Sequence, residues 1–350
     1  MKISQPYLDF IKYSITQEQI PPASCYKIDW RDFLQYCNRQ GIIGLIFDGL
    51  QRAELRIGQN ALFEWISFAE SIKVQNAAVN KRIEQITKFF EEKGFRSCVL
   101  KGQANGMMYP KPELRSPGDI DIWVDGGRED VIKMVKSVAP DAHYSIHHIK
   151  LPVYKDVSVE VHYRPIYMMN WFTDKKLQRY ISNVEERQFS HKVKLGDGEI
   201  GCLTDDFNVV YQLLHMFAHF GSTRNNFKQF IDYFFLLRKG LNPQECKDSV
   251  EMIMELGLYK YATGIMWIMS EVLGLEEKFL IVEPNEKEGK LILKESFYFG
   301  TWSTNKLRSV IEQFVANFRI VTHYPKEVLI SPLFLVWHQW WKVKMEFAIR

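Results

Sequence analysis

Hydrophobic residues recur at helical spacing in the first quarter of the chain. Those between residues 60 and 93 stand three, four or seven positions apart and predict one long helix: Ile72, Val79, Ile83, Ile86 and Phe90. Asp29 is a suitable N-cap for an earlier helix that stops at Gly41, and Gly94 ends the long helix. Residues 1–95 are therefore predicted to be a helical region.

From Phe95 onward, short apolar runs and alternating residues replace this pattern. "FRSCVLKG" and "DIDIWV" are typical of strands, and the amphipathic "GGREDVIKMVKSVAP" predicts a helix. Two β-hairpins are then expected, one joining "HYSIHHIKLPVY" to "VSVEVHYRP" and one joining "QFSHKVKL" to "EIGCL". Residues 96–203 are predicted to form a small α/β core.

Helical periodicity returns after Thr204, a suitable N-cap that is followed by two aspartates in the first turn. It holds for most of residues 204–350, with the polar stretch 283–290 as the clear loop-like interruption. The predicted fold class is therefore α+β: a small mixed β-sheet core flanked by N-terminal and C-terminal helical segments.

Charge and composition narrow the class of protein. Lysine and arginine total 45 against 42 acidic residues, so neither a nucleic-acid partner nor a membrane-surface partner is expected. The chain has neither the apolar core of a signal peptide nor about 18 consecutive uncharged apolar residues, which predicts a cytoplasmic protein. The five cysteines are odd in number and far apart, so they are expected to be reduced core thiols.

Two aspartates stand at alternate positions of the strand "DIDIWV". Asp119 and Asp121 therefore share a face, with their Cα atoms about 7 Å apart. Glu160 has the matching position in "VSVEVHYRP", so pairing of the two strands would bring three carboxylates together. Such a cluster needs a cation because like charges raise one another's pKa. Oxygen ligands favour Mg²⁺ or Mn²⁺, and paired ions suit phosphoryl or nucleotidyl transfer.

Residues near the first strand can contact a triphosphate. Lys101 and Gly102 close that strand where a helix should begin; glycine lets a phosphate approach the backbone, and lysine supplies charge. Arg115 is a second cation that could hold phosphate oxygens in a bidentate fork. His162 lies beside Glu160 on the same face, where it could orient a carboxylate, contact the nucleotide or serve only as a structural histidine.

For three further pairs of polar residues, structural roles are favoured over metal binding or catalysis. His147 and His148 are adjacent, so strand alternation points them to opposite faces and argues against a chelating pair. His215 and His219 have a spacing compatible with zinc, but packing against the core is the favoured interpretation. Lys228 and Asp232 are expected to form an ion pair on a helix surface.

The Trp-rich stretch 332–347 could lie on a membrane surface, but packing on the helical domain or a dimer contact is favoured, which leaves a homo-oligomer open.

Four segments carry a family resemblance in order and type. These are "VLKGQANGMMYPKPELRSPGDIDIWV", "VEVHYRP", "LLHMFAHF" and "FKQFIDYFFLL". Together they resemble the uncharacterised bacterial nucleotidyltransferase-like family of the DNA-polymerase-β-type nucleotidyltransferase superfamily, over residues 40–240.

The resemblance implies a mixed-sheet nucleotidyltransferase core in which Asp119 and Asp121 bind catalytic Mg²⁺ or Mn²⁺. Glu160 would be the third carboxylate, which coordinates one metal or helps deprotonate the acceptor. In the wider superfamily a Gly-Ser pair opens the phosphate loop; here Lys101, Gly102 and Gln103 stand at that place, without the serine.

The leading hypothesis is a metal-dependent nucleotidyltransferase that moves an NMP group from an NTP such as ATP to a small-molecule or protein acceptor. One alternative is an inactive nucleotide- or partner-binding protein of the same fold, for instance an antitoxin-like module. A metal-dependent nucleotide-sugar glycosyltransferase also uses an Asp-x-Asp pair, but about 95 helical residues precede the motif here, where that class needs a larger parallel sheet.

Overall fold

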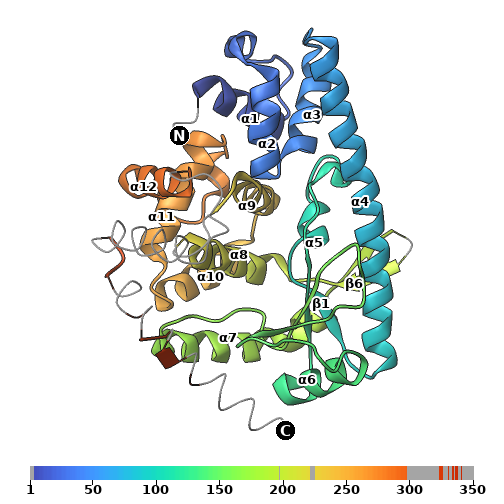
Figure 1. Cartoon of the computed structure of the whole chain (residues 1–350). Coiled ribbons are helices and arrows are strands. Elements are labelled where there is room, and N and C mark those ends of the chain that lie inside the picture. Colours follow the sequence, from blue (N-terminus) through green and yellow to red (C-terminus); the bar gives the residue numbers. More distant parts are fainter. Residues whose placement is uncertain are drawn as a thin grey trace.

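The architecture is that of an α+β protein in which helices surround a small sheet. The computed structural model describes residues 4–196, 198–220, 225–297, 323–325, 330, 333–334, 336–337 and 340. Figure 1 shows the long helix α4 (Gln59–Glu92) along one side of the molecule and the later helices on the opposite side. The predicted fold class is confirmed.

The N-terminal region contains α1 (Gln5–Thr16), α2 (Trp30–Gln40), α3 (Ile43–Ala53) and α4. The Asp29 carboxylate accepts hydrogen bonds from the first backbone N–H groups of α2, and Gly41 ends that helix with a φ of 67°. Gly94 has a φ of 81° just beyond α4, a conformation that favours glycine. The predicted cap, stop and long helix are therefore confirmed.

A four-stranded mixed sheet forms the centre of the molecule. Its strands are β1 (Ser97–Val99), β2 (Ile120–Val124), β3 (His148–Lys150) and β4 (Val159–His162), in the order β1-β2-β4-β3. The β2–β4 pair is parallel, and its two neighbouring pairs are antiparallel. Strands β5 (Lys192–Leu195) and β6 (Gly198–Gly201) form a separate antiparallel pair. Both predicted hairpins are present.

The two faces of the mixed sheet have different environments. On one face, alternating aliphatic residues such as Ile120, Ile122 and Val161 pack against α4 and α6 (Gly127–Val138) in a continuous buried cluster. On the other face, the ring of Trp123 lies 4.6 Å from that of Phe189 on α7 (Trp171–Ser190). The polar residues of β2 and β4 alternate with the aliphatic ones and therefore share the second face.

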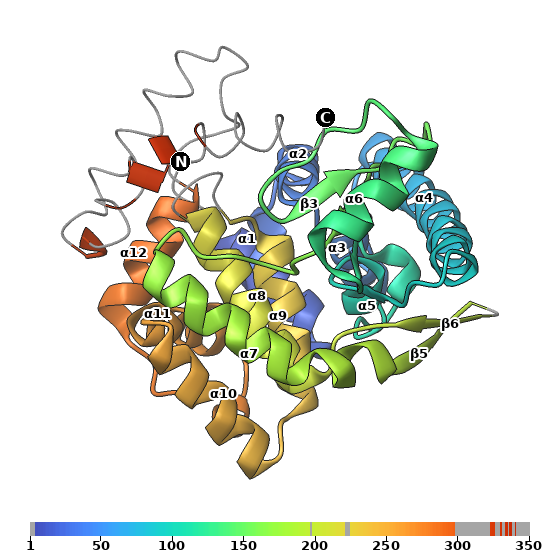
Figure 2. The same cartoon turned by 90° about the horizontal axis from the view of Figure 1, so that it is seen from below.

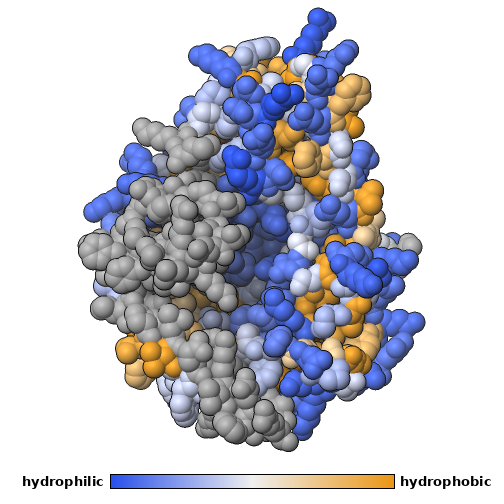
Figure 3. All heavy atoms as spheres, viewed as in Figure 1, coloured by the Kyte–Doolittle hydropathy of each residue, from blue (hydrophilic) through white to orange (hydrophobic). Residues whose placement is uncertain are grey.

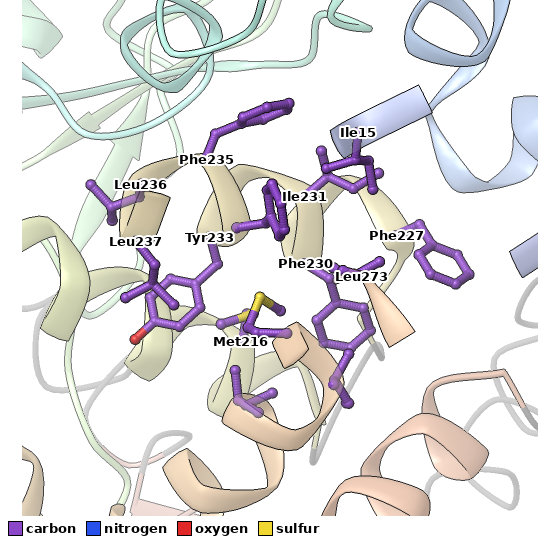
Figure 4. Close-up of a cluster of buried hydrophobic side chains, with 14 of the residues drawn as sticks. Ile15, Met216, Phe227, Phe230, Ile231, Tyr233, Phe235, Leu236, Leu237 and Leu273 are labelled. Carbon is purple, nitrogen blue, oxygen red and sulfur yellow. The ribbon is translucent and has the colours of Figure 1, made fainter. Parts of the chain in front are cut away.

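The C-terminal half is a helical layer. It contains α8 (Asp205–Phe220), α9 (Phe227–Lys239), α10 (Pro243–Glu255), α11 (Tyr259–Trp267) and α12 (Glu286–Phe297). Seen from below, α7 runs across α8 and α9 (Figure 2), and the rings of Tyr180 and Phe207 are 5.6 Å apart. Buried side chains of α9 are the centre of the apolar cluster in Figure 4, which also includes Ile15 of α1.

Two helix boundaries differ from the sequence prediction. The stretch 283–290 was predicted to be a loop, but α12 begins inside it at Glu286 because the Asn285 side chain accepts a hydrogen bond from the Glu288 N–H at 3.1 Å. The predicted strand "QFSHKVKL" begins within helix α7, which extends to Ser190 and leaves only residues 192–195 to β5. In the first place an asparagine cap begins a helix inside the polar stretch, and in the second α7 continues through residues that were assigned to a strand.

Apolar side chains are exposed along the first half of α4. They include Phe63 and Val74, which are 69% and 70% exposed. Figure 3 shows orange side chains on the side of the molecule where Figure 1 places α4.

None of the described helices is long and apolar enough to cross a membrane. All five cysteines are free thiols, and four of them are buried. Most of the Trp-rich stretch 332–347 lies outside the described residues.

Candidate functional site

The parallel pairing of β2 and β4 brings two acidic residues together. Asp121 is directly opposite Glu160 in the register of these strands. The Asp121 side chain is 3% exposed and that of Glu160 is 20% exposed. One oxygen of each carboxylate and one ring nitrogen of His162 lie within 4.8 Å of one another. Two carboxylates and an imidazole thus converge at one point on the sheet face.

Asp119 lies immediately before the strand that carries Asp121. Strand β2 begins at Ile120, so Asp119 belongs to the preceding loop, and its side chain is exposed. It lines the same cavity as Asp121 and Glu160 but is not one of the three residues that converge within 4.8 Å. The structure therefore groups Asp121 with Glu160 and His162 and leaves Asp119 in the cavity wall.

Lys101 neutralises the charge on Asp121, and His162 forms a hydrogen bond with it. The Lys101 Nζ atom lies 3.1 Å from Asp121 Oδ2, and His162 Nε2 lies 3.1 Å from Oδ1. Burial alone would raise the pKa of Asp121, but Lys101 and the His162 hydrogen bond outweigh it and hold the pKa below its usual range. Burial and the charge of Asp121 raise the pKa of Glu160. Asp121 is therefore the more strongly ionised of the two carboxyl groups.

His147 and His148 contact each other, contrary to the prediction from strand alternation. His147 lies just before β3, which begins at His148, so the alternation does not extend to it. The His147 Nε2 and His148 Nδ1 atoms are 3.1 Å apart, and Ser145 Oγ lies 3.1 Å from the same Nδ1. Burial and the nearby His162 lower the pKa of His147 to about 2 and that of His148 to about 4. Both imidazoles are neutral at pH 7.

Helix α8 adds two more histidines to the same region. His215 Nε2 lies 3.3 Å from Lys101 Nζ, and His219 Nε2 lies 3.1 Å from His215 Nε2. Burial lowers the pKa of His219 to about 4 and holds that of His215 well below its usual range. The helix packs against the α/β core as predicted, and its histidines also line the cavity.

A cavity of about 680 Å³ lies beside these groups. Its polar lining residues include Asp119, Asp121, Glu160, Lys101 and the histidines His147, His162, His215 and His219. The rest is largely apolar, with side chains from α8, from the segment before α7 and from the C-terminal part of the chain: Ile166, Met168, Leu214, Phe217, Phe220 and Tyr324. A cavity of this size can hold a nucleotide-sized or drug-sized molecule.

The family model for an uncharacterised nucleotidyltransferase matches residues 26–274, which is well over half of the chain. The chain belongs to this nucleotidyltransferase family. Among solved structures, one similar chain is an antigenic nucleotidyltransferase-like protein from Paracoccidioides brasiliensis, with 10% sequence identity and a TM-score of 0.31. The match covers 50% of this chain and 87% of that one. No curated protein matches the sequence.

In this member of the family, the residues after Lys101 have structural contacts. Helix α5 has only four residues, Gln103–Gly106, and Gly102 before it has a φ of 68°. The Gln103 side-chain amide donates hydrogen bonds to Asn76 and Asn80 of α4, at 3.0 and 2.5 Å. Neither Gly102 nor Gln103 is among the described residues that line the cavity. Lys101 is the member of this trio that reaches it.

Arg115 lies apart from the cavity, in a buried ion pair that the sequence did not suggest. Its guanidinium contacts both carboxylate oxygens of Asp232, at 2.8 and 2.7 Å, and the side chain is 4% exposed. The Tyr109 hydroxyl donates to the same carboxylate at 2.7 Å. Asp232 is therefore a buried partner of Arg115, and the predicted surface ion pair with Lys228 is wrong. Arg115 is not among the described residues that line the cavity, so this ion pair is its observed role.

Lys228 lies near the Arg115–Asp232 pair, and its pKa is lower than usual. Burial, with a further contribution from Arg115, lowers its pKa to about 8. The charged form of Lys228 is therefore disfavoured in the folded protein relative to the unfolded chain, where the pKa is about 10.4.

We expect Lys228→Met to raise the free energy of unfolding of the protein by about 1–2 kcal/mol at pH 7, after allowance for the partial exposure of this side chain. Between pH 8 and 10.4 the unfolded chain keeps the Lys228 proton and the folded protein loses it, so this residue's contribution to stability rises with pH. The advantage of the variant should shrink over that window. Urea unfolding of both proteins at pH 7, 8, 9 and 10 measures it, and an advantage that does not change with pH would contradict the prediction.

Proposed function

We propose that this protein is a metal-dependent nucleotidyltransferase that moves an NMP group from an NTP to an acceptor. The observation that carries the proposal is the convergence of Asp121 and Glu160 on adjacent parallel strands, beside Asp119 and Lys101 in one cavity. The two carboxylates, each with an oxygen in this group of atoms within 4.8 Å of one another, offer the oxygen ligands that fit a Mg²⁺ or Mn²⁺ ion.

The proposed roles follow from these positions. Asp121 and Glu160, with Asp119 at the cavity wall, would hold the divalent cation, which when bound neutralises phosphate charge. His162 fixes the orientation of Asp121 through its 3.1 Å contact. Lys101 lies next to the same carboxylate, and its ammonium group can pair with a phosphate oxygen of the NTP.

The acceptor would occupy the apolar part of the cavity. Side chains of α8 and of the segment before α7 form that part, and they face the carboxylates across the same space. An acceptor hydroxyl or phosphate carried on an apolar body fits this arrangement, because the apolar wall supplies binding energy and the polar end supplies the chemistry.

A metal-free binding protein is a second candidate, and one contact favours it. Lys101 Nζ already lies 3.1 Å from Asp121, where it supplies positive charge that a cation would otherwise bring. A protein that uses this lysine as a permanent counter-charge would bind a nucleotide or a partner without turnover.

The test is to incubate the full-length protein with each NTP, Mg²⁺ or Mn²⁺ and a small-molecule cell extract. Calorimetry measures metal–NTP binding, and a coupled assay measures pyrophosphate release. The control is the double variant Asp121→Asn/Glu160→Gln. Equal metal–NTP binding by both proteins would show that the proposed site is wrong. Binding by the wild type without pyrophosphate release would support the second candidate.

A further inference from the structure

Three histidines meet at the edge of the sheet next to the carboxylates. The strand register places His148 of β3 directly opposite His162 of β4, and His147 precedes His148. The ring centroids are 4.5 Å apart for His147 and His148, and each lies 5.2–5.3 Å from the ring of His162. One ring nitrogen from each of the three lies within 4.8 Å of the other two.

The hydrogen bonds of His162 leave one ring nitrogen available. Nε2 contacts the Asp121 carboxylate, which can only accept, so Nε2 carries the proton of this hydrogen bond. In the neutral ring, Nδ1 then carries a lone pair, and this atom is buried without a hydrogen-bond partner among the described residues. An imidazole held by a carboxylate at one nitrogen and free at the other is the usual arrangement of a metal-ligating histidine.

The spacing also fits a small transition-metal ion. Tetrahedral Zn²⁺ with bonds of about 2.0–2.1 Å to nitrogen holds its ligand atoms about 3.3 Å apart. His147 Nε2 and His148 Nδ1 are already 3.1 Å apart.

We propose that His147, His148 and His162 form a zinc-binding site adjacent to the carboxylates of the cavity. Three imidazole nitrogens select Zn²⁺ over Mg²⁺, because Mg²⁺ prefers oxygen ligands whereas Zn²⁺ binds imidazole strongly. Three protein nitrogens and one further ligand complete a four-coordinate zinc site. The proposal concerns metal binding alone and does not depend on nucleotidyl transfer.

The experiment uses the full-length protein after removal of metals with a chelator. Zn²⁺ affinity is measured by competition with a chromophoric chelator, in buffer with and without excess Mg²⁺. We expect one tight Zn²⁺ equivalent per chain that excess Mg²⁺ does not displace. The variant His147→Gln/His148→Gln should bind Zn²⁺ at least ~100-fold more weakly.

The matched control is His143→Gln. His143 lies in the segment before β3, but its side chain is exposed and is not in the three-histidine cluster. This variant should retain the wild-type Zn²⁺ affinity. Thermal melts of the metal-free proteins establish whether each variant folds. If the double variant does not fold, His147→Gln alone replaces it in the Zn²⁺ measurement.

A second measurement needs no variant. Co²⁺ in a four-coordinate nitrogen-rich site absorbs visible light strongly, whereas hydrated Co²⁺ is six-coordinate and absorbs weakly. A strong spectrum that Zn²⁺ abolishes would support the site. Equal Zn²⁺ affinity in the wild type and in a folded histidine variant would overturn it, as would displacement of Zn²⁺ by Mg²⁺. Each of these results is obtained without NTP, so it is separate from the outcome of the transfer assay.

Discussion

Replacement of Asp121 by asparagine is expected to lower NTP-dependent pyrophosphate release by about 10³-fold or more. The substitution keeps the shape of the side chain and removes the charge at the point where Glu160, His162 and Lys101 converge. The loss should appear in the maximal rate at saturating NTP and Mn²⁺. Pyrophosphate release in the assay described above measures it.

The control for this experiment is Asp141→Asn. Asp141 is exposed between α6 and β3 and does not line the cavity. This control replaces an aspartate by an asparagine, as Asp121→Asn does, and it should leave the rate of pyrophosphate release unchanged. Both variants should retain the wild-type melting transition. An Asp121→Asn protein that keeps more than a tenth of the wild-type rate would show that this carboxylate does not hold the catalytic cation.

Replacement of Arg115 by methionine is expected to reduce the free energy of unfolding by about 3–5 kcal/mol. Asp232 is 5% exposed, and its two carboxylate oxygens contact Arg115 at 2.8 and 2.7 Å. Without the guanidinium, the hydrogen bonds that described residues still donate to the buried carboxylate are those of the Tyr109 hydroxyl at 2.7 Å and of Asn105 at 3.5 Å. Urea unfolding at pH 7 measures the difference.

Two further variants test whether the loss of stability comes from the buried ion pair or from the removal of any arginine. Arg31→Met removes a surface pair with Glu64 in which the side chains are 62% and 44% exposed, and it should cost less than about 1 kcal/mol. Adding Asp232→Leu to Arg115→Met removes the unpaired charge and should restore part of the lost stability. A loss in Arg115→Met no larger than that in Arg31→Met would contradict the assignment of this pair.

The pair also predicts how stability responds to acid. Burial alone would raise the pKa of Asp232, but Arg115 and Tyr109 hold it below its usual range. A carboxyl group with a depressed folded-state pKa stabilises the protein above its unfolded pKa of about 3.9, and the contribution is lost as pH falls through the folded value. This acid-sensitive contribution should be missing from the Arg115→Met protein.

Local sequence patterns predicted the elements better than the contacts between them. The long helix, its glycine stop and both hairpins follow from residues close in the chain, and the structure has them. The matching faces of "DIDIWV" and "VSVEVHYRP" also indicated that Glu160 could meet an aspartate, and the structure pairs it with Asp121.

The contacts that the sequence did not predict join residues whose proximity no local pattern indicates. Arg115 and Asp232 are 117 residues apart, and only the packing of α9 against the loop before β2 brings them together. The contact between His147 and His148 depends on a strand that begins one residue later than alternation suggested.

Helix α4 contributes to the two large hydrophobic clusters of the described residues, which are the cores of the helical part and of the sheet. Its first half buries Trp65, Ala69 and Ile72 among the helices, and its second half buries Val79, Ile83, Ile86 and Phe90 behind the sheet. A break in the middle of this helix would therefore disturb both cores at once, and the two are expected to melt in one cooperative transition. The α/β segment 96–203 contains the strands but not the helix that covers one face of them, so as an isolated fragment it would expose that apolar face to water.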